Sequence, residues 1–209
     1  MDLEFFKSKW NILLTAAATI LSLLLGFVDV PSYASAPLGS NANYETMGKV
    51  ILAIIIALML VLCSLLNRKK NTTLWVIATL VFLAFALIAY FKGVSNKSHT
   101  TVDYTSYYPG QYVVKGDHLL PEKDSLWKDM EKGKGSIVNE TEFFAENHEF
   151  NDSAGILTAS NLWPRNEIER NAKNIIYFYL ATIIFFALAL VSALQSLYCM
   201  TVKPVKAVS

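Results

Sequence analysis

The stretch "SLLNRKKNTTLW", from Ser64 to Trp75, decides the fold because it sets three adjacent cations between two long apolar runs. On a soluble helix, these cations at 68–70 would mark a hydrated face. The flanking runs, residues 48–66 and 73–91, instead have the length and the apolar composition of helices that cross a membrane. We therefore interpret the stretch as a short cytoplasmic hairpin between two membrane spans.

Two more apolar runs, residues 11–28 and 174–200, have a comparable length. A helix needs about 20 predominantly apolar residues to cross the hydrocarbon core of a bilayer, and all four runs come near that length. Apolar residues make up 54% of the chain and charged residues only 17%, against about a quarter in a typical soluble domain. The sequence therefore predicts a mainly α-helical integral membrane protein with a four-helix transmembrane bundle.

Two alternatives concern these apolar runs. The first run resembles a signal peptide, because it has a basic start, an apolar middle and a small-residue site at Ala34–Ala36. Its apolar part is about 18 residues long, which exceeds the usual length of about 7–15, so we expect the first helix to be uncleaved. A soluble helical core is disfavoured because the runs lack a polar stripe.

Cations next to the spans predict how the chain threads through the membrane, because short cytoplasmic loops are rich in Lys and Arg. In a four-span protein, the amino-terminal flank, the hairpin and the carboxy-terminal tail share one side. They hold seven cations, namely Lys7, Lys9, Arg68, Lys69, Lys70, Lys203 and Lys206. The loop at 29–47 holds no Lys or Arg. We therefore expect both termini to be cytoplasmic, in a plasma or inner membrane, with residues 29–47 and 92–173 facing outward.

Aromatic residues near the ends of the runs agree with membrane spans. Indole and phenol rings favour the boundary between lipid and water, where the apolar ring and its polar group are both accommodated. The expected interface anchors are Trp10, Trp75, Tyr90, Tyr177 and Tyr198.

The same pattern divides the chain into three parts. Residues 1–91 hold three spans, residues 92–173 form an extracytoplasmic insertion, and residues 174–209 hold the fourth span and a short cytoplasmic tail. The insertion is rich in turn signals, so we expect a small α+β fold that opens with one or two short strands. A helix should follow over Glu122–Lys132, and another should begin at Pro164 and continue unbroken into the fourth span.

The insertion carries all three histidines but no recognisable catalytic motif. An acid–base or zinc site would have to join His118, His148 and a carboxylate in space, and the spacing signature HExxH is missing. We interpret these side chains as surface histidines beside surface acids. The two cysteines, Cys63 and Cys199, lie in apolar runs and offer no metal-binding spacing. We therefore expect no catalytic residue, no metal site and no cofactor.

The middles of the spans contain no ionisable residue, which disfavours proton-coupled transport and voltage sensing. Small residues indicate helix contacts instead, because they let membrane helices approach closely. The candidate contact residues are Thr15, Ala16, Thr19, Ala53, Ala57, Ala189 and Ala193, together with the polar Gln195. The alternative is that alanine is simply common in membrane helices, and both interpretations stay open.

Four spans with a large outer segment between the third and the fourth resemble the layout of tetraspanins. The outer domain of that family carries a Cys-Cys-Gly motif and paired cysteines, whereas residues 92–173 contain no cysteine. Claudins place their larger outer loop after the first span. The resemblance therefore covers topology alone, and it assigns neither a family nor a function to this chain.

These features predict a non-enzymatic membrane protein that works by assembly, as an accessory, scaffold or effector subunit of a larger system. Its partners would be the lipid bilayer and either a second copy of itself or another membrane protein. A net charge of +1 with scattered basic residues argues against a nucleic-acid partner. A passive channel or membrane-permeabilising oligomer is the first alternative, since hydrophobic constrictions can gate a pore. A membrane enzyme with chemistry on the outer segment is the second.

Overall fold

The computed structural model describes most of the chain after residue 29. The described ranges are 30–38, 44–66, 68–103, 112–134, 143, 149–151, 156–158 and 160–201. This part is mainly helical, and three of its helices are long and apolar enough to cross a membrane. They are α3 (Tyr44–Leu65), α4 (Thr72–Thr100) and α7 (Arg165–Thr201).

These three helices cover residues 48–65, 73–91 and 174–200 of the predicted spans, so the prediction of a mainly helical chain with helices long and apolar enough to cross a membrane is confirmed. The first predicted span, residues 11–28, lies outside the described residues. The four-helix bundle therefore stays a prediction.

The chain forms two compact units. The first, called here the spanning unit, comprises residues 45–90 and 180–201 of the described part. The second, called the insertion unit, comprises residues 30–44 and 91–179. Residues 30–38 were predicted only as part of a short connecting loop, yet they fold with the insertion unit.

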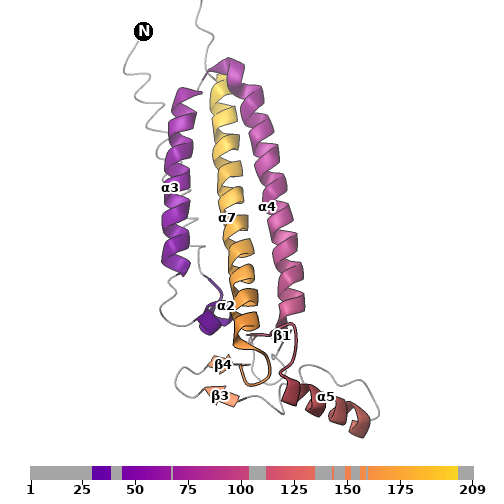
Figure 1. The fold of residues 1–209 in the computed structure, drawn as a ribbon. Coiled ribbons are helices and arrows are strands. Elements are labelled where there is room, and N and C mark those ends of the chain that lie inside the picture. The colour runs from indigo at the N-terminus through magenta and orange to yellow at the C-terminus, as the bar shows by residue number, and fades with distance from the viewer. Residues whose placement is uncertain are drawn as a thin grey trace, which may run out of the picture. The chain divides into compact units, whose positions relative to one another are not determined.

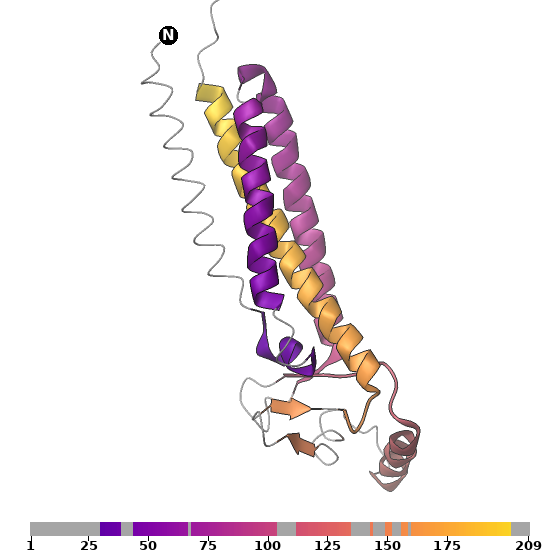
Figure 2. The ribbon, with the colours of Figure 1, turned by 60° about the vertical axis from the view of Figure 1, so that its left-hand side comes forward.

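In the spanning unit, α7 packs against both α3 and α4, and it runs alongside them in both ribbon views (Figure 1, Figure 2). Leu52 and Ile56 of α3 are buried against Ala187 of α7, which is itself fully buried. Phe85 of α4 stacks on Phe185 of α7, with ring centroids 5.4 Å apart. The small side chain of Ala187 lets two helix backbones approach, as expected where lipid supplies no hydrophobic drive for association.

The hairpin between α3 and α4 is closed by hydrogen bonds. The indole Nε1 of Trp75 donates to the carbonyl oxygen of Leu66 at 3.1 Å, just past the end of α3. The short 3-10 helix η2 (Lys69–Asn71) leads into α4, and the hydroxyl of Thr72 donates to the Lys69 carbonyl at 2.8 Å. The Lys69 carbonyl also accepts a hydrogen bond from the backbone N–H of Thr72, so both groups of Thr72 fix the start of α4.

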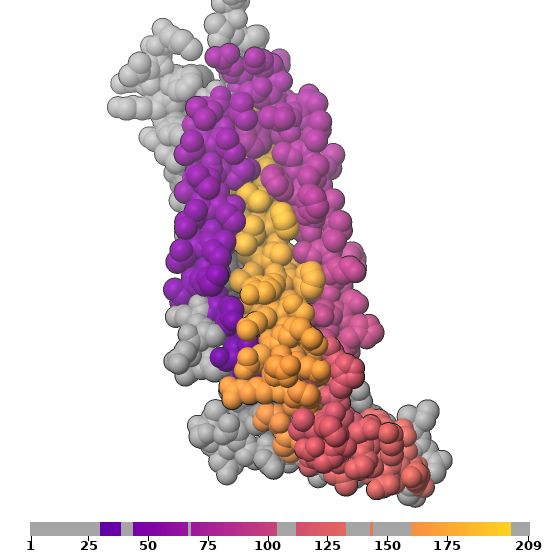
Figure 3. Space-filling model, viewed as in Figure 1, coloured from indigo at the N-terminus to yellow at the C-terminus, as the bar shows by residue number. Residues whose placement is uncertain are grey.

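Most of the apolar surface of α4 is left uncovered in the described part of the chain. In its spanning part only Trp75, Ala86 and Ala89 are buried. The exposed large apolar side chains are Leu74, Val76, Ile77, Leu80, Val81, Leu83, Phe85, Leu87 and Ile88. The space-filling view shows one side of this helix beside α7 (Figure 3). Such a surface suits lipid or another membrane helix.

The insertion unit mixes short strands with helices. Strand β1 (Thr101–Asp103) pairs antiparallel with β2 (Tyr112–Val114), and β3 (Glu149–Asn151) pairs antiparallel with β4 (Ile156–Thr158). Helix α2 (Ser32–Ser35) and the 3-10 helix η1 (Ala36–Leu38) precede α3 in the chain. The buried apolar residues are Val30, Ala34, Val102, Val113, Val114, Phe143, Leu162, Trp163, Ile168, Ala172, Ile175 and Ile176.

Two helices of this unit match their predicted positions. The helix expected over Glu122–Lys132 is α5 (Pro121–Lys134). Helix α7 follows directly after Pro164 and continues without a break to Thr201. The carbonyl oxygen of Pro164 accepts hydrogen bonds from the backbone N–H groups of Glu167 and Ile168, at 3.0 and 3.2 Å.

Helix α4 is longer than the span predicted from its apolar residues. The apolar run ends at Phe91, but the helix continues to Thr100. Gly93 lies within this extension, and a β-carbon there would be 3.3 Å from the β-carbon of Phe178 on α7. A glycine after an apolar run could have been expected to end the helix. Gly93 instead allows α4 and α7 to approach closely.

Candidate functional site

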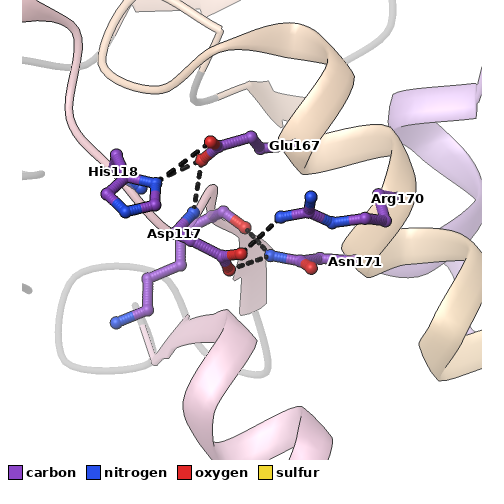
Figure 4. A network of polar contacts seen from close by, with 6 residues as sticks. Asp117, His118, Glu167, Arg170 and Asn171 are labelled. Atoms are coloured by element: carbon purple, nitrogen blue, oxygen red, sulfur yellow. Dashed lines mark hydrogen bonds and ion pairs between the residues drawn. The ribbon is translucent and has the colours of Figure 1, made fainter.

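The main polar cluster of the insertion unit joins the segment at 115–118 to the first turns of α7 (Figure 4). This segment follows β2 and holds Gly116, which is buried. A β-carbon at Gly116 would lie 2.9 Å from the Oε2 atom of Glu167 and 2.9 Å from the β-carbon of Trp163. Only a glycine therefore lets the backbone lie this close to α7.

The carboxylate of Glu167 receives three hydrogen bonds from this segment. Its Oε2 atom accepts from the backbone N–H groups of Asp117 and His118, at 2.7 and 2.9 Å. Its Oε1 atom lies 3.1 Å from Nδ1 of His118. The backbone hydrogen bond from His118 is the largest influence lowering the pKa of Glu167, and the other bonds from this segment add to it. The carboxylate is thereby kept ionised.

Two further side chains on the same face of α7 complete the cluster (Figure 4). The guanidinium of Arg170 forms an ion pair with Asp117. The amide of Asn171, a buried residue, donates to the Lys115 carbonyl at 3.0 Å and to Oδ1 of Asp117 at 2.9 Å. We call these contacts between the segment at 115–118 and α7 the loop latch. Residues three and four positions after Glu167 share its face, so α7 presents all three side chains together.

The loop latch can be compared with a catalytic pair, because a carboxylate beside an imidazole nitrogen can orient the ring as a base. The geometry favours a structural role. Glu167 uses both oxygens on the segment at 115–118, and the side chain of His118 is 81% exposed to solvent. Within the described ranges, no three His, Cys, Asp or Glu side chains are grouped so that they could hold a metal ion. His148, the other candidate base, lies outside those ranges.

A second cluster in the insertion unit surrounds Lys97. Its ammonium group lies 3.9 Å from the ring centroid of Tyr112 and 5.3 Å from that of Tyr33. The two rings are 5.6 Å apart and tilted by 51°. This aromatic clamp ties α2, the last turns of α4 and strand β2 together. Burial is the main cause that raises the pKa of the Tyr33 hydroxyl, and the nearby Tyr112 and Tyr179 add to it.

Polar groups also meet inside the spanning unit. The Nε2 atom of Gln195 on α7 donates to the carbonyl oxygen of Cys63 on α3 at 3.0 Å. This carbonyl lies in the last turn of α3. Gln195 is 1% exposed, and its Oε1 atom and the hydroxyl of Ser192 are buried without a hydrogen-bond partner among the described residues.

The predicted helix-contact residues differ in how far they are buried. Gln195 and Ala189 are buried, Ala53 and Ala193 are half-buried, and Ala57 is exposed. The remaining three candidates, Thr15, Ala16 and Thr19, lie outside the described residues. Ala187, which is fully buried, was not among the predicted contact residues.

The predicted interface anchors and topology signals are also distributed unevenly. Trp75 is 4% exposed and packs with Met59, Cys63 and Leu188, whereas Tyr90 and Tyr177 are exposed and Tyr198 is half-buried. The three cations of the hairpin are all exposed, namely Arg68, Lys69 and Lys70. The predicted residues outside the described ranges are Trp10, Lys7, Lys9, Lys203 and Lys206.

The loop latch itself was not predicted. Asp117 and Glu167 are separated by fifty positions in the sequence, so no local pattern joins them. The available signal was the charged and amide face of the helix after Pro164, together with a glycine beside an acidic residue at 116–117.

No protein-family model, no curated protein and no solved structure matches this chain.

Proposed function

We propose that this chain is a non-enzymatic, multi-pass membrane protein that works by assembly, as an accessory, scaffold or effector subunit of a larger membrane system. The observation that carries the proposal is the exposed face of α3. Val50, Ile54 and Val61 are each more than half exposed there, and the small residue Ala57 lies between them. A small residue on an uncovered apolar face is the geometry that lets a second membrane helix approach closely.

The intramolecular contacts support α3 over α7 as the assembly surface. Ala189 of α7 is buried within the chain, together with Ala187 and Ser192. These small residues are already used to pack α7 inside the spanning unit. The partner is then a second copy of the chain or another membrane protein that docks on α3.

The loop latch supports a non-enzymatic role for the insertion unit. Glu167, Arg170 and Asn171 direct their polar groups to the segment at 115–118. These side chains hold the fold of the unit together, so a partner would meet a preorganised surface.

We also propose that four spans place both termini in the cytoplasm of a plasma or inner membrane. The packing of residues 30–38 with the segment after Phe91 supports this topology, because two segments that fold together lie on one side of the membrane. The cations at 68–70, which are exposed beyond the other ends of α3 and α4, fit the cytoplasmic side. Reporter fusions at both termini test the orientation, and fusions that are active only outside the cytoplasm would contradict it.

The assembly proposal is tested with the full chain in mild detergent and in nanodiscs, by light scattering and by counting photobleaching steps. We expect the wild type to exceed the mass of one copy or to co-purify with a membrane protein. Ala57→Leu should reduce the assembly. Ala84→Leu, the same change at an exposed position of α4, is the matched control and should leave it intact. A wild type that is monomeric and without a partner in both media would overturn the proposal.

A further inference from the structure

One face of α7 in the insertion unit lines an open groove of about 420 Å³. The lining side chains among the described residues are Asn166, Glu169, Arg170, Lys173, Asn174 and Tyr177. They recur at spacings of three and four, so they form one stripe along three turns of the helix. The groove shares Arg170 with the loop latch, whereas Glu167 and Asn171 of the latch do not line it.

The ion pairs along this stripe leave one cation uncompensated. The carboxylate of Glu169 is bound by Arg165 at 3.0 Å, and the guanidinium of Arg170 is bound by Asp117. Lys173, one turn further along, has no acidic partner within 4 Å among the described residues, and it is half-buried. The groove therefore offers a positive charge at the end that points toward the apolar part of α7.

Neutral hydrogen-bond donors lie beside this charge. The side-chain amide of Asn174 and the hydroxyl of Tyr177 have no hydrogen-bond partner in the described part of the chain. Tyr177 is 55% exposed, so its ring and its hydroxyl are both accessible. An ammonium, an amide and a phenol within one turn form a set of donors suited to the oxygens of a phosphate group.

The position along the helix identifies the kind of phosphate. Before Lys173 the helix is polar, and from Ile175 onward it is a continuous apolar run. The phosphates of a phospholipid bilayer lie at this kind of boundary, where lysine and tyrosine side chains reach out of the apolar region. We propose that the groove binds a membrane phospholipid through its phosphate, with Lys173 as the ion-pair partner and Asn174 and Tyr177 as hydrogen-bond donors.

Native mass spectrometry of the full chain in mild detergent tests this site with phosphatidylglycerol as the probe. We expect Lys173→Gln to weaken the affinity for phosphatidylglycerol about fivefold, the effect of one cation near a lipid surface. Tyr177→Phe, which removes a single hydroxyl, should weaken it about threefold. The matched control is Lys92→Gln, because Lys92 is an exposed lysine of α4 in the insertion unit and does not line the groove. It should leave the affinity unchanged.

Three outcomes would overturn the proposal. An unchanged affinity in Lys173→Gln would show that the lysine holds no lipid. An equal loss in Lys92→Gln would show a general attraction between lysines and lipid in place of a site. Displacement of phosphatidylglycerol by an equal concentration of glycerol 3-phosphate would show that the groove takes a soluble phosphate. If Lys173→Gln also lowers the thermal unfolding midpoint, the result for Tyr177→Phe is used to test the site. An unchanged affinity for phosphatidylglycerol in Tyr177→Phe would then contradict the proposal.

Discussion

The Nε2 atom of Gln195 donates a hydrogen bond of 3.0 Å to the carbonyl oxygen of Cys63, which lies 132 residues earlier in the chain. The bond joins α7 to the last turn of α3 inside the apolar part of the protein. An unsatisfied backbone group in a membrane costs several kcal/mol, so a side chain that reaches it stabilises the pair of helices.

Replacing this donor should weaken the spanning unit. We expect Gln195→Leu to lower the free energy of unfolding by about 1 kcal/mol, in the range measured for hydrogen bonds between membrane helices. The measurement is unfolding of the full chain by dodecyl sulfate in micelles, followed by circular dichroism. Ser196→Ala is the control, because the Ser196 hydroxyl donates only to Ala193 of its own helix. Equal effects of the two changes would contradict a special role for Gln195.

The loop latch should be sensitive to the volume of residue 116. Gly116→Ala places a methyl group 2.9 Å from Glu167 and Trp163, so we expect a loss of about 1–3 kcal/mol in the stability of the insertion unit. Hydrogen exchange of the backbone amides at 115–120 measures it. Gly93→Ala is the matched control, because its methyl group also crowds a neighbour, the β-carbon of Phe178 at 3.3 Å, but meets no atom of the segment at 115–118. It should leave the exchange of the amides at 115–120 unchanged. If the backbone amides at 115–120 exchange as slowly in Gly116→Ala as in the wild type, this packing is disproved.

Because the pKa of Glu167 is lowered in the folded protein, its contribution to the stability of the insertion unit depends on pH. A carboxyl group whose pKa is lowered in the folded state stabilises the fold at any pH above its ordinary pKa of 4.5. This stability is lost as the pH falls through the lowered pKa of the folded state. We expect Glu167→Gln to increase exchange of the Asp117 and His118 amides at neutral pH. The difference from the wild type should shrink below about pH 4.5.

Glu169→Gln is the control for that experiment. Glu169 pairs with Arg165 on its own helix and makes no contact with the segment at 115–118. Its substitution should leave the exchange of the latch amides unchanged. A difference between wild type and Glu167→Gln that stays constant from neutral pH to pH 3 would rule out ionisation of Glu167 as the cause.

The aromatic clamp should depend on the charge of Lys97. Lys97→Gln removes the cation between Tyr33 and Tyr112, and we expect a loss of about 0.5–1 kcal/mol. Lys97→Arg keeps the charge and should retain most of the stability. Hydrogen exchange of the β2 amides reports the change. If glutamine and arginine behave alike, the lysine acts through its alkyl chain.

The three long apolar helices could be predicted because their signal is local. A run of about 20 apolar residues is sufficient to identify a membrane helix, and residues 48–66, 73–91 and 174–200 each provide one. The same criterion misplaced the end of α4, since it detects the lipid boundary and not the end of the helix. Residues 92–100 contain no proline, and their single glycine packs against Phe178. The helix therefore continues.

The polar contacts could not be predicted because they depend on distant partners. Gln195 was identified as a helix-contact candidate, but its acceptor at Cys63 depends on how α3 and α7 are paired. Trp75 is a residue type typical of interface anchors, yet its indole donates a hydrogen bond to the Leu66 carbonyl and its ring is buried. In both cases the residue type was informative, and the three-dimensional packing decided its role.

The continuous apolar run of α7 creates a hydrophobic mismatch with its neighbour. The run from Ile175 to Met200 corresponds to about 39 Å of helix, whereas the whole of α3, from Tyr44 to Leu65, corresponds to about 33 Å. A hydrocarbon core of about 30 Å matches α3 and is too thin for an upright α7. The longer helix must tilt, or the bilayer around it must thicken. We therefore expect membrane thickness to bias where a protein with these two helices accumulates, independently of any partner.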